Sequence, residues 1–355
     1  MRIVITGNMG YVGPVLAAHL RRRFPDADLV GYDSGLFASC LTTRGPLPET
    51  VLSAQHFGDV REFPAELLRE TDAVVHLAAV SNDPMGKQYE QVTDEINHGA
   101  SLRIAEMAQD MGVRNFVFAS SCSVYGFAEG GPRREGDALN PLTAYARSKI
   151  DTERGLQAFG NGPMTTTCLR FATACGMSDR LRLDLVLNDF VACAMSSGEI
   201  SILSDGTPWR PLIDVADMAR AIEWAIGRPA ERGGRYLTVN AGSNRWNLRV
   251  RDLADAVARQ IPGTKVSVNP DAPPDRRSYQ VDFSLFSELA PEHQPVVELA
   301  DSVGRLRAGL DGIGFADADF RNSAQIRLRV LGALAAAGKL SPDLRWRFGG
   351  AAGGA

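Results

Sequence analysis

The chain has 355 residues, of which 45% are hydrophobic and 23% charged, and its formal net charge is −4. This composition is that of an ordinary globular protein, and the charge balance excludes a strongly basic nucleic-acid-binding protein and gives no reason to expect binding to anionic membranes. No apolar run reaches the roughly 18 residues that a membrane-spanning helix needs, and the first residues do not form a secretory signal. We therefore expect a cytoplasmic protein.

The cysteines and histidines indicate neither disulfide bonds nor a metal site. The five cysteines lack close CxxC pairs, and the five histidines lack HxxxH or HExxH spacing. These spacings are what a structural zinc site or a hydrolytic metal site requires. We therefore expect no bound metal.

Short apolar segments alternate with longer amphipathic segments along the first half of the chain. The apolar segments predict strands at 2–6, 28–33, 73–78 and 115–120, with further strands at 165–170 and 236–240. The amphipathic segments predict helices at 11–24, 99–111 and 143–159, and later at 183–197, 215–227, 249–260 and 299–310. Strands that alternate with helices predict βαβ units, and therefore an α/β fold with a doubly wound parallel sheet of the Rossmann type.

Three glycines follow the first predicted strand and lead into a helix. Gly7, Gly10 and Gly13 have the spacing GxxGxxG, and Tyr11 and Val12 lie between the last two. Glycine lets the backbone turn tightly and lets a diphosphate approach, while the helix N-terminus offers free N–H groups. We therefore predict a dinucleotide-binding loop rather than a tight turn without a ligand.

An acidic residue ends the second predicted strand. Asp33 lies 20 residues after Gly13, where a carboxylate can bind both ribose hydroxyls of an adenosine. The same carboxylate would repel the additional phosphate of NADP, so we predict NAD as the cofactor. Asp59 and Val60, in the segment GDVRE, are candidate contacts of the adenine. For Asp59, a simple turn acid is the open alternative.

A tyrosine and a lysine supply a candidate for chemistry. Tyr145 and Lys149 are four residues apart, so they share one face of a helix. A free tyrosine has a pKa near 10, but a nearby cation and an oxidised nicotinamide both favour its phenolate form. The phenolate can take a hydroxyl proton while a hydride leaves the same carbon. Lys149 is also a candidate ligand of the nicotinamide ribose.

A serine at the end of another predicted strand completes this set. Ser121 lies in FASSCSVYG, where parallel sheets place their ligand-binding loops. Its hydroxyl can hydrogen-bond the reacting hydroxyl of a substrate. The alternative for Tyr145 and Lys149 is a pair on a helix surface, but with seven tyrosines and only four lysines in the chain this spacing rarely arises by chance.

The motifs together resemble a known family. The glycine triplet, HLAA at 76–79, SSCSVYG and YARSK occur in the order found in the extended short-chain dehydrogenase/reductases. More closely, residues 1–285 resemble the NAD-dependent epimerase/dehydratase group that acts on nucleotide sugars. The resemblance implies that Ser121, Tyr145 and Lys149 form a catalytic triad. It implies that NAD contacts Leu77, Ala78 and Ala79. Asn97 matches the structural asparagine of the family, or is a helix cap.

The resemblance also implies how the chain is divided. Residues 1–170 would form the dinucleotide-binding domain, completed by about 210–240. Residues 171–209 and 241–347 would form a smaller mixed α/β portion that binds the substrate. The low-complexity end, 348–355, is predicted to be a disordered tail.

Further residues match positions that bind a nucleoside-diphosphate sugar in this family. Arg210 and Arg277 match arginines around the diphosphate, and a guanidinium binds such oxygens bidentately. Asn188 matches an asparagine near the same group. Ser81 and Ser123 are additional candidate substrate-binding residues. The alternatives are surface arginines and, for Asn188, a helix cap.

The residues after Ser121 bear on the reaction. Dehydratases of the resembled family carry an Asp-Glu pair there, whereas this chain has Cys122 and Ser123. Neither replaces a carboxyl group readily, so a 4,6-dehydratase is disfavoured. We expect an NAD-dependent nucleotide-sugar epimerase acting at carbon 4 through a transient keto-sugar. The alternatives are an NAD(P)-dependent ketoreductase or dehydrogenase and, less favoured, an inactive cofactor-binding protein. For Cys122 we favour a buried thiol over a proton donor.

Two segments remain without an assigned role. Residues 34–53 are long for a connection in a parallel sheet, and predict either a lid or partner contact, or an ordinary surface insertion. Residues 317–347 predict a helix with a basic end, outside the resemblance. By the resemblance, we expect a homodimer that pairs the helices near 99–111 and 143–159.

Overall fold

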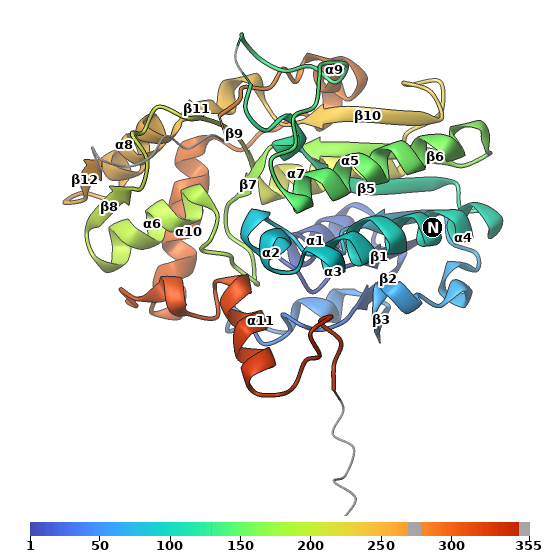
Figure 1. The fold of residues 1–355 in the computed structure, drawn as a ribbon, viewed down its shortest axis with the longest axis horizontal. Helices are drawn as coiled ribbons and strands as arrows, with labels where there is room; N and C mark the ends of the chain where they lie inside the picture. Colours follow the sequence, from blue (N-terminus) through green and yellow to red (C-terminus); the bar gives the residue numbers. More distant parts are fainter. Residues whose placement is uncertain (129, 269–277, 348–355) are drawn as a thin grey trace, which may run out of the picture.

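The computed structural model describes residues 1–128, 130–268 and 278–347. In this part of the chain, seven strands form a central sheet in the order β10-β6-β5-β4-β1-β2-β3, and all neighbours are parallel (Figure 1). The strands are β1 (Arg2–Thr6), β2 (Asp28–Asp33), β3 (Ala54–Phe57), β4 (Ala73–His76), β5 (Asn115–Ser121), β6 (Thr165–Phe171) and β10 (Tyr236–Ala241). The chain runs outward from β1 to β3 and then from β4 to β6. This is the doubly wound sheet that we predicted, so the fold class is confirmed.

Helices cover both faces of this sheet. On one face lie α1 (Gly13–Arg23) and α7 (Val215–Ile226), and on the other lie α4 (Ser101–Asp110) and α5 (Ala144–Gln157). Strands buried on both faces are continuous apolar runs, because successive side chains point to opposite sides. Ile3 and Ile5 accordingly pack with α1 and α7, whereas Val4 packs with α4.

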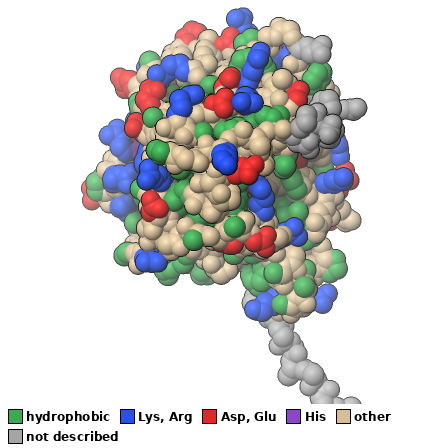
Figure 2. All heavy atoms as spheres, turned by 90° about the vertical axis from the view of Figure 1, so that its left-hand side faces the viewer, with side chains coloured by type: hydrophobic (Ala, Val, Ile, Leu, Met, Phe, Trp, Pro, Cys, Tyr) green, Lys and Arg blue, Asp and Glu red, His purple; other side chains and the backbone are tan. Residues whose placement is uncertain are grey.

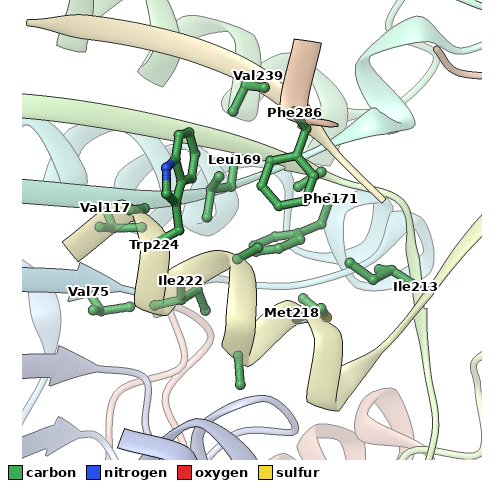
Figure 3. Packing of buried hydrophobic residues seen from close by; sticks show 14 of the residues in the cluster. Val75, Val117, Leu169, Phe171, Ile213, Met218, Ile222, Trp224, Val239 and Phe286 are labelled. Carbon is green, nitrogen blue, oxygen red and sulfur yellow. The ribbon is translucent and has the colours of Figure 1, made fainter. Parts of the chain in front are cut away.

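The core beneath α7 shows how this helix is attached to the sheet. Met218, Ile222 and Trp224 are buried and pack among apolar side chains from the strands of the sheet (Figure 3). Asp214 caps the start of α7, because its carboxylate accepts a hydrogen bond from the backbone N–H of Ala216.

The remaining strands and helices form a smaller portion beside the main sheet. Among the described residues, its strands are β7 (Thr173–Cys175), β9 (Trp209–Asp214) and β11 (Asn247–Arg249) in one sheet, and β8 (Glu199–Ile202) and β12 (Lys265–Val268) in another. The helices that pack on one another there are α6 (Val186–Ser196), α8 (Val250–Gln260) and α10 (Leu299–Ile313). The chain enters this portion after β6, leaves it to form α7 and β10, and enters it again.

The C-terminal segment, residues 317–347, is not the single helix that we predicted. Only α11 (Arg327–Ala336) is α-helical there. The helix ends because Gly338 adopts φ +69°, while the N–H of Lys339 bonds back to the carbonyl of Leu334. Leu340 and Trp346 then form an antiparallel bridge. The predicted tail, 348–355, lies outside the described residues.

The long connection 34–53 packs against this C-terminal segment. Leu36 and Phe37 join an apolar cluster with Leu331 and Leu344. The indole N–H of Trp346 donates to the backbone carbonyl of Ser34 over 2.6 Å. The remaining α-helices of the described chain are the short α2 (Asp83–Gln88), α3 (Glu90–Asp94) and α9 (Ser284–Leu289). Two segments far apart in the sequence therefore form one layer beside the main sheet.

On the face shown in Figure 2, acidic and basic side chains are interspersed. In the described ranges no helix combines the length and apolar character needed to cross a membrane. The five cysteines are all buried and free.

Candidate active site

A cavity of about 1170 Å³ lies at the C-terminal ends of the main parallel strands. Its walls come from the turn after β1, from the loops after β2, β4 and β5, from the smaller portion and from the C-terminal segment. In doubly wound sheets this edge is where ligands bind. Residues that bind the cofactor or the substrate are therefore expected to line this cavity.

The glycine turn borders the cavity. Gly7, Gly10, Tyr11 and Val12 line it. Gly7 has φ +73°, and a Cβ there would lie 2.5 Å from the backbone nitrogen of Ala78, so only glycine fits. Gly7 thus lets the loop after β4 pack directly against the turn that borders the cavity.

The third glycine of the motif has a different position. Gly13 is not part of the cavity lining. A Cβ on Gly13 would lie 1.9 Å from the carbonyl oxygen of Asn8. Gly13 therefore lets the start of α1 pack on the turn, and the structure does not place it against a ligand.

Asp33 lines the cavity at the end of β2 and is held by the backbone. Its carboxylate accepts hydrogen bonds from the N–H of Met9 over 2.9 Å and from the N–H of Gly35 over 2.7 Å. Burial raises the pKa of Asp33, although these bonds partly oppose the shift. A carboxylate offers about four acceptor positions, so capacity remains for two ribose hydroxyls.

The other predicted cofactor contacts also line the cavity. They are Asp59, Val60, Leu77, Ala78 and Ala79. Burial acts to raise the pKa of Asp59, but the hydrogen bonds and charge of Arg61 outweigh it and hold the pKa below its ordinary value. Asp59 caps the short helix after it and pairs with Arg61, so the role of a turn acid and that of a cofactor contact are both compatible with its place.

The structure brings Ser121, Tyr145 and Lys149 together on one wall. Ser121 ends β5, and α5 begins just before Tyr145 because Thr143 caps it by accepting from the N–H of Ala146. The Ser121 hydroxyl lies close enough to the Tyr145 phenol to affect its pKa. The Lys149 Nζ lies 5.5 Å from the centroid of the Tyr145 ring.

Lys149 is held as a buried cation. It is 3% exposed, and its Nζ donates to the carbonyl of Ala119 over 2.7 Å. Burial lowers its pKa to about 8, although nearby Glu153 partly opposes the shift. The ammonium therefore remains mostly protonated at neutral pH while having little access to water.

The protein alone does not make Tyr145 a base. Burial, followed by the charge of Asp83, raises its pKa to about 12; the nearby Ser121 hydroxyl and the charge of Arg182 only partly offset this. The expectation that neighbouring cations favour the phenolate thus needs a further positive charge beside the ring, which a bound oxidised nicotinamide carries.

Asn97 supports this wall from behind. It lies in a π-helical turn, Glu95–Ala100, a feature frequent at functional sites. Its side-chain oxygen accepts from the N–H of Val80, and its amide donates to the carbonyl of Val80 and to the Ser148 hydroxyl. Asn97 therefore ties the loop after β4 to α5, which is a structural role.

Cys122 and Ser123, the two residues after Ser121, lie in different surroundings. The Cys122 thiol is fully buried and donates to the carbonyl of Arg170 over 3.1 Å, and burial raises its pKa. Ser123 lines the cavity, and its buried hydroxyl has no hydrogen-bond partner among the described residues. An unpartnered buried hydroxyl suits a site that a polar ligand completes.

The predicted substrate-binding residues do not all lie on the cavity. Ser81 and Arg210 line the cavity. Asn188 does not: it is fully buried, its amide donates to the carbonyl of Arg182 and to the Tyr11 hydroxyl, and its oxygen accepts from the N–H of Gly176. The structure thus places Asn188 behind the wall. Arg277 lies outside the described residues.

The sequence analysis missed a polar cluster beside Tyr145. The Arg182 guanidinium donates to the Ser81 hydroxyl over 3.0 Å and to the Asp184 carboxylate over 2.8 Å. The Asn82 amide donates to the same carboxylate over 2.7 Å. All four side chains border the cavity. The alternating charges of RLRLD, in an otherwise apolar stretch, were the signal available.

No group of three or more potential metal ligands was found in the described part of the chain. What the cavity combines is a glycine turn, an acid at the end of the second strand and a serine, tyrosine and lysine on one wall. On a doubly wound sheet, this combination defines an extended short-chain dehydrogenase/reductase.

Comparison with known proteins identifies the family. Residues 3–242 match the sequence model of the NAD dependent epimerase/dehydratase family, and the chain belongs to that family. It is therefore an NAD-dependent enzyme, and the glycine turn and Asp33 fit that cofactor.

Three relatives illustrate the similarity. UDP-glucose 4-epimerase of Azospirillum brasilense is 28% identical over 303 residues, which cover 77% of this chain and 82% of the relative. dTDP-glucose 4,6-dehydratase of Streptomyces griseus is 28% identical over 250 residues, covering 69% and 74%. The structure of MoeE5 in complex with UDP-glucuronic acid and NAD superposes with a TM-score of 0.73 at 25% identity, covering 88% of this chain and 99% of that one. The chain is thus similar to epimerases and to dehydratases of nucleotide sugars.

Proposed function

We propose that the enzyme is a nucleotide-sugar epimerase that inverts carbon 4 through a transient keto-sugar. The observation that carries the proposal is the wall formed by Ser121, Tyr145 and Lys149, which faces the same cavity as the glycine turn. The next two residues are a buried thiol and a serine, so the wall lacks the acid pair that an elimination of water would use.

The residues of the chain have separate tasks in this reaction. When bound, NAD supplies the hydride acceptor and a positive charge. Tyr145 takes the proton of the sugar hydroxyl and later returns it. Ser121, which borders the cavity with Tyr145, would orient the reacting hydroxyl. Lys149, whose Nζ lies 5.5 Å from the centroid of the Tyr145 ring, would stabilise the phenolate through its charge and would also bind a ribose hydroxyl.

The substrate would lie between the two portions of the chain. Arg210, which borders the cavity, would bind the diphosphate, and Arg277 is proposed for the same role from the sequence alone. Ser81, Ser123 and the Arg182–Asp184 pair offer donors and acceptors for sugar hydroxyls near Tyr145. Asn188 would act on this wall indirectly, by holding Tyr11 and the carbonyl of Arg182.

The reaction can be tested with a panel of UDP-, dTDP-, GDP- and CDP-sugars. We expect a product of unchanged mass, with NMR showing inversion at carbon 4 and no net change in nicotinamide absorbance. Loss of one water molecule would instead identify a dehydratase. A change of two hydrogens, with stoichiometric turnover of nicotinamide, would identify the alternative, a ketoreductase or dehydrogenase. The Tyr145→Phe variant is the control for contaminating activity.

The homodimer and the cytoplasmic location stay predictions. Light scattering of the purified chain tests whether it forms a dimer. The predicted dimer pairs α4 and α5, so charge reversal at exposed positions of these two helices should break it. A dimer that persists in this variant would show that the interface lies elsewhere.

A further inference from the structure

The C-terminal segment forms part of the cavity although it lies beyond the residues that match the family, 3–242. Its contributions are Arg321, Ile326, Arg327, Leu328, Arg329, Leu331 and Leu344. The apolar cluster with Leu36 and Phe37 attaches it to the loop after β2, and ion pairs of Arg61 with Asp343 and of Arg345 with Glu62 attach it to the loop after β3. This wall is thus fixed beside the residues assigned to the cofactor.

Arg327 is the unusual residue of this wall. It is 1% exposed, and its guanidinium donates to the carbonyls of Arg180 and Ala324. It also lies over the ring of Phe37, 5.1 Å from the centroid. Within the described ranges Arg327 forms no ion pair with a carboxylate.

Two neighbouring buried arginines show the contrast. Arg180 pairs with Glu49, and Arg182 pairs with Asp184. A buried charge without a counter-charge is costly, so such groups are usually paired. Arg228, also 1% exposed, is likewise held by carbonyls and by Thr167, but it does not border this cavity. Burial lowers the pKa of Arg327 to about 10, which still leaves it protonated at neutral pH. A protonated guanidinium therefore borders the cavity with carbonyls as its protein partners.

The contacts of Arg327 lead to the cofactor side of the cavity. Phe37, which it covers, follows Asp33 by four residues in the loop after β2. Arg180, whose carbonyl it binds, lies two residues from Ser178, and the Ser178 hydroxyl donates to the carbonyl of Tyr11 in the glycine turn over 2.6 Å. Arg327 is thus linked to both segments that the fold assigns to the adenosine and diphosphate of NAD.

We propose that Arg327 is a cofactor-binding residue whose guanidinium forms an ion pair with the diphosphate of NAD. The C-terminal segment then completes the cofactor site, and a bound dinucleotide supplies the directly paired counter-charge that the described residues do not provide to Arg327. Arginine suits this role, because its planar fork matches phosphate oxygens bidentately.

The test is the affinity of the Arg327→Met variant for NAD, measured by calorimetry on protein freed of nucleotide. We expect about 10- to 100-fold weaker binding, the effect of losing one or two charge-assisted hydrogen bonds. ADP should lose affinity by a similar factor, whereas adenosine, which lacks the diphosphate, should not. Arg327→Lys should recover part of the loss, because the charge is retained.

The controls separate this role from others. Arg307→Met, on the exposed face of α10 and away from the cavity, should bind NAD like the unaltered enzyme. Unaltered NAD affinity in Arg327→Met would overturn the proposal, and so would a loss of UDP affinity in place of ADP affinity. An equal loss for adenosine and ADP, with a lower melting temperature, would show a structural role instead. No sugar turnover enters these measurements, so they stand apart from the proposed epimerase reaction.

Discussion

The buried position of Lys149 lowers the free energy of unfolding of the protein when no cofactor is bound. Its ammonium is buried, and burial lowers its pKa to about 8. At pH 7 the folded protein therefore holds a charge that water would stabilise better. We expect Lys149→Met to raise the free energy of unfolding of the cofactor-free protein by about 1–3 kcal/mol at pH 7, while turnover is lost.

The pH dependence gives this prediction a sign. The buried ammonium destabilises the protein to its full extent below about pH 8, because Lys149 is then protonated in both the folded and the unfolded chain. Between about pH 8 and the ordinary lysine pKa, the folded protein has released the proton and the unfolded chain has not. The free energy of unfolding of the unaltered protein therefore rises with pH, and its difference from that of the variant becomes smaller. Thermal unfolding at pH 7 and at pH 10 measures this. A gap that widens at pH 10 would contradict the assignment.

Tyr145 carries the chemistry in our proposal. Tyr145→Phe keeps the ring and removes the hydroxyl, so we expect turnover to fall by about 10²–10⁴-fold, the usual contribution of a general base. NAD affinity should change little, because the ring packing is retained. Steady-state rates and calorimetry of the same preparation measure both quantities. Turnover within a few-fold of the unaltered enzyme would refute the role.

Sequence reasoning was most effective for residues linked by short spacing. Four residues on one helix place Tyr145 and Lys149 on the same wall, and a strand end places Ser121 beside Tyr145. Asn188 and Arg182 could not be located in this way. Their orientation depends on the path of the irregular loop between β7 and α6, which long-range contacts with Tyr11 and Ser81 determine.

At the level of the elements, the turn between β1 and α1 depends on the absence of one side chain. A Cβ on Gly13 would meet the backbone of Asn8 at 1.9 Å, and backbone cannot easily move aside. We expect Gly13→Ala to lower the free energy of unfolding by about 2–3 kcal/mol, as overpacking does, and to weaken NAD binding by distorting the turn. Chemical denaturation measures the first effect.

Gly304 provides the matched control. It is exposed within α10, and a Cβ there would meet nothing within 4 Å. Gly304→Ala should therefore stabilise the protein by about 0.5–1 kcal/mol, because alanine loses less backbone entropy in a helix. If both glycine variants had the same effect, the close approach at Gly13 would not be the cause.

The strands were the most predictable elements and the C-terminal segment the least. A buried parallel strand is a continuous apolar run, which is why the segment 28–33 was predicted with the bounds that β2 has. In the C-terminal segment, Gly338 and Pro342 interrupt the helical pattern, and contacts with residues near Ser34 determine the path after the break. Such distant contacts leave no local pattern in the sequence.

At the scale of the whole molecule, the cavity joins parts that are far apart in the chain. We expect NAD to slow amide hydrogen exchange in residues 34–53 and 327–346, because bound cofactor would contact both walls. Exchange in α9, which does not line the cavity, should stay unchanged. Mass spectrometry of peptides from the enzyme with and without NAD measures this. Protection confined to the glycine turn would contradict the proposed completion of the site.

The order of the strands also has a consequence for synthesis on the ribosome. β6 ends at Phe171, but its outer neighbour β10 begins only at Tyr236. At roughly 5–20 residues per second, the intervening stretch takes several seconds to translate. During that interval β6 has a row of unpaired backbone N–H and C=O groups along one edge, which is a template for pairing with another chain. A fragment that ends before residue 236 would keep this edge of β6 unpaired.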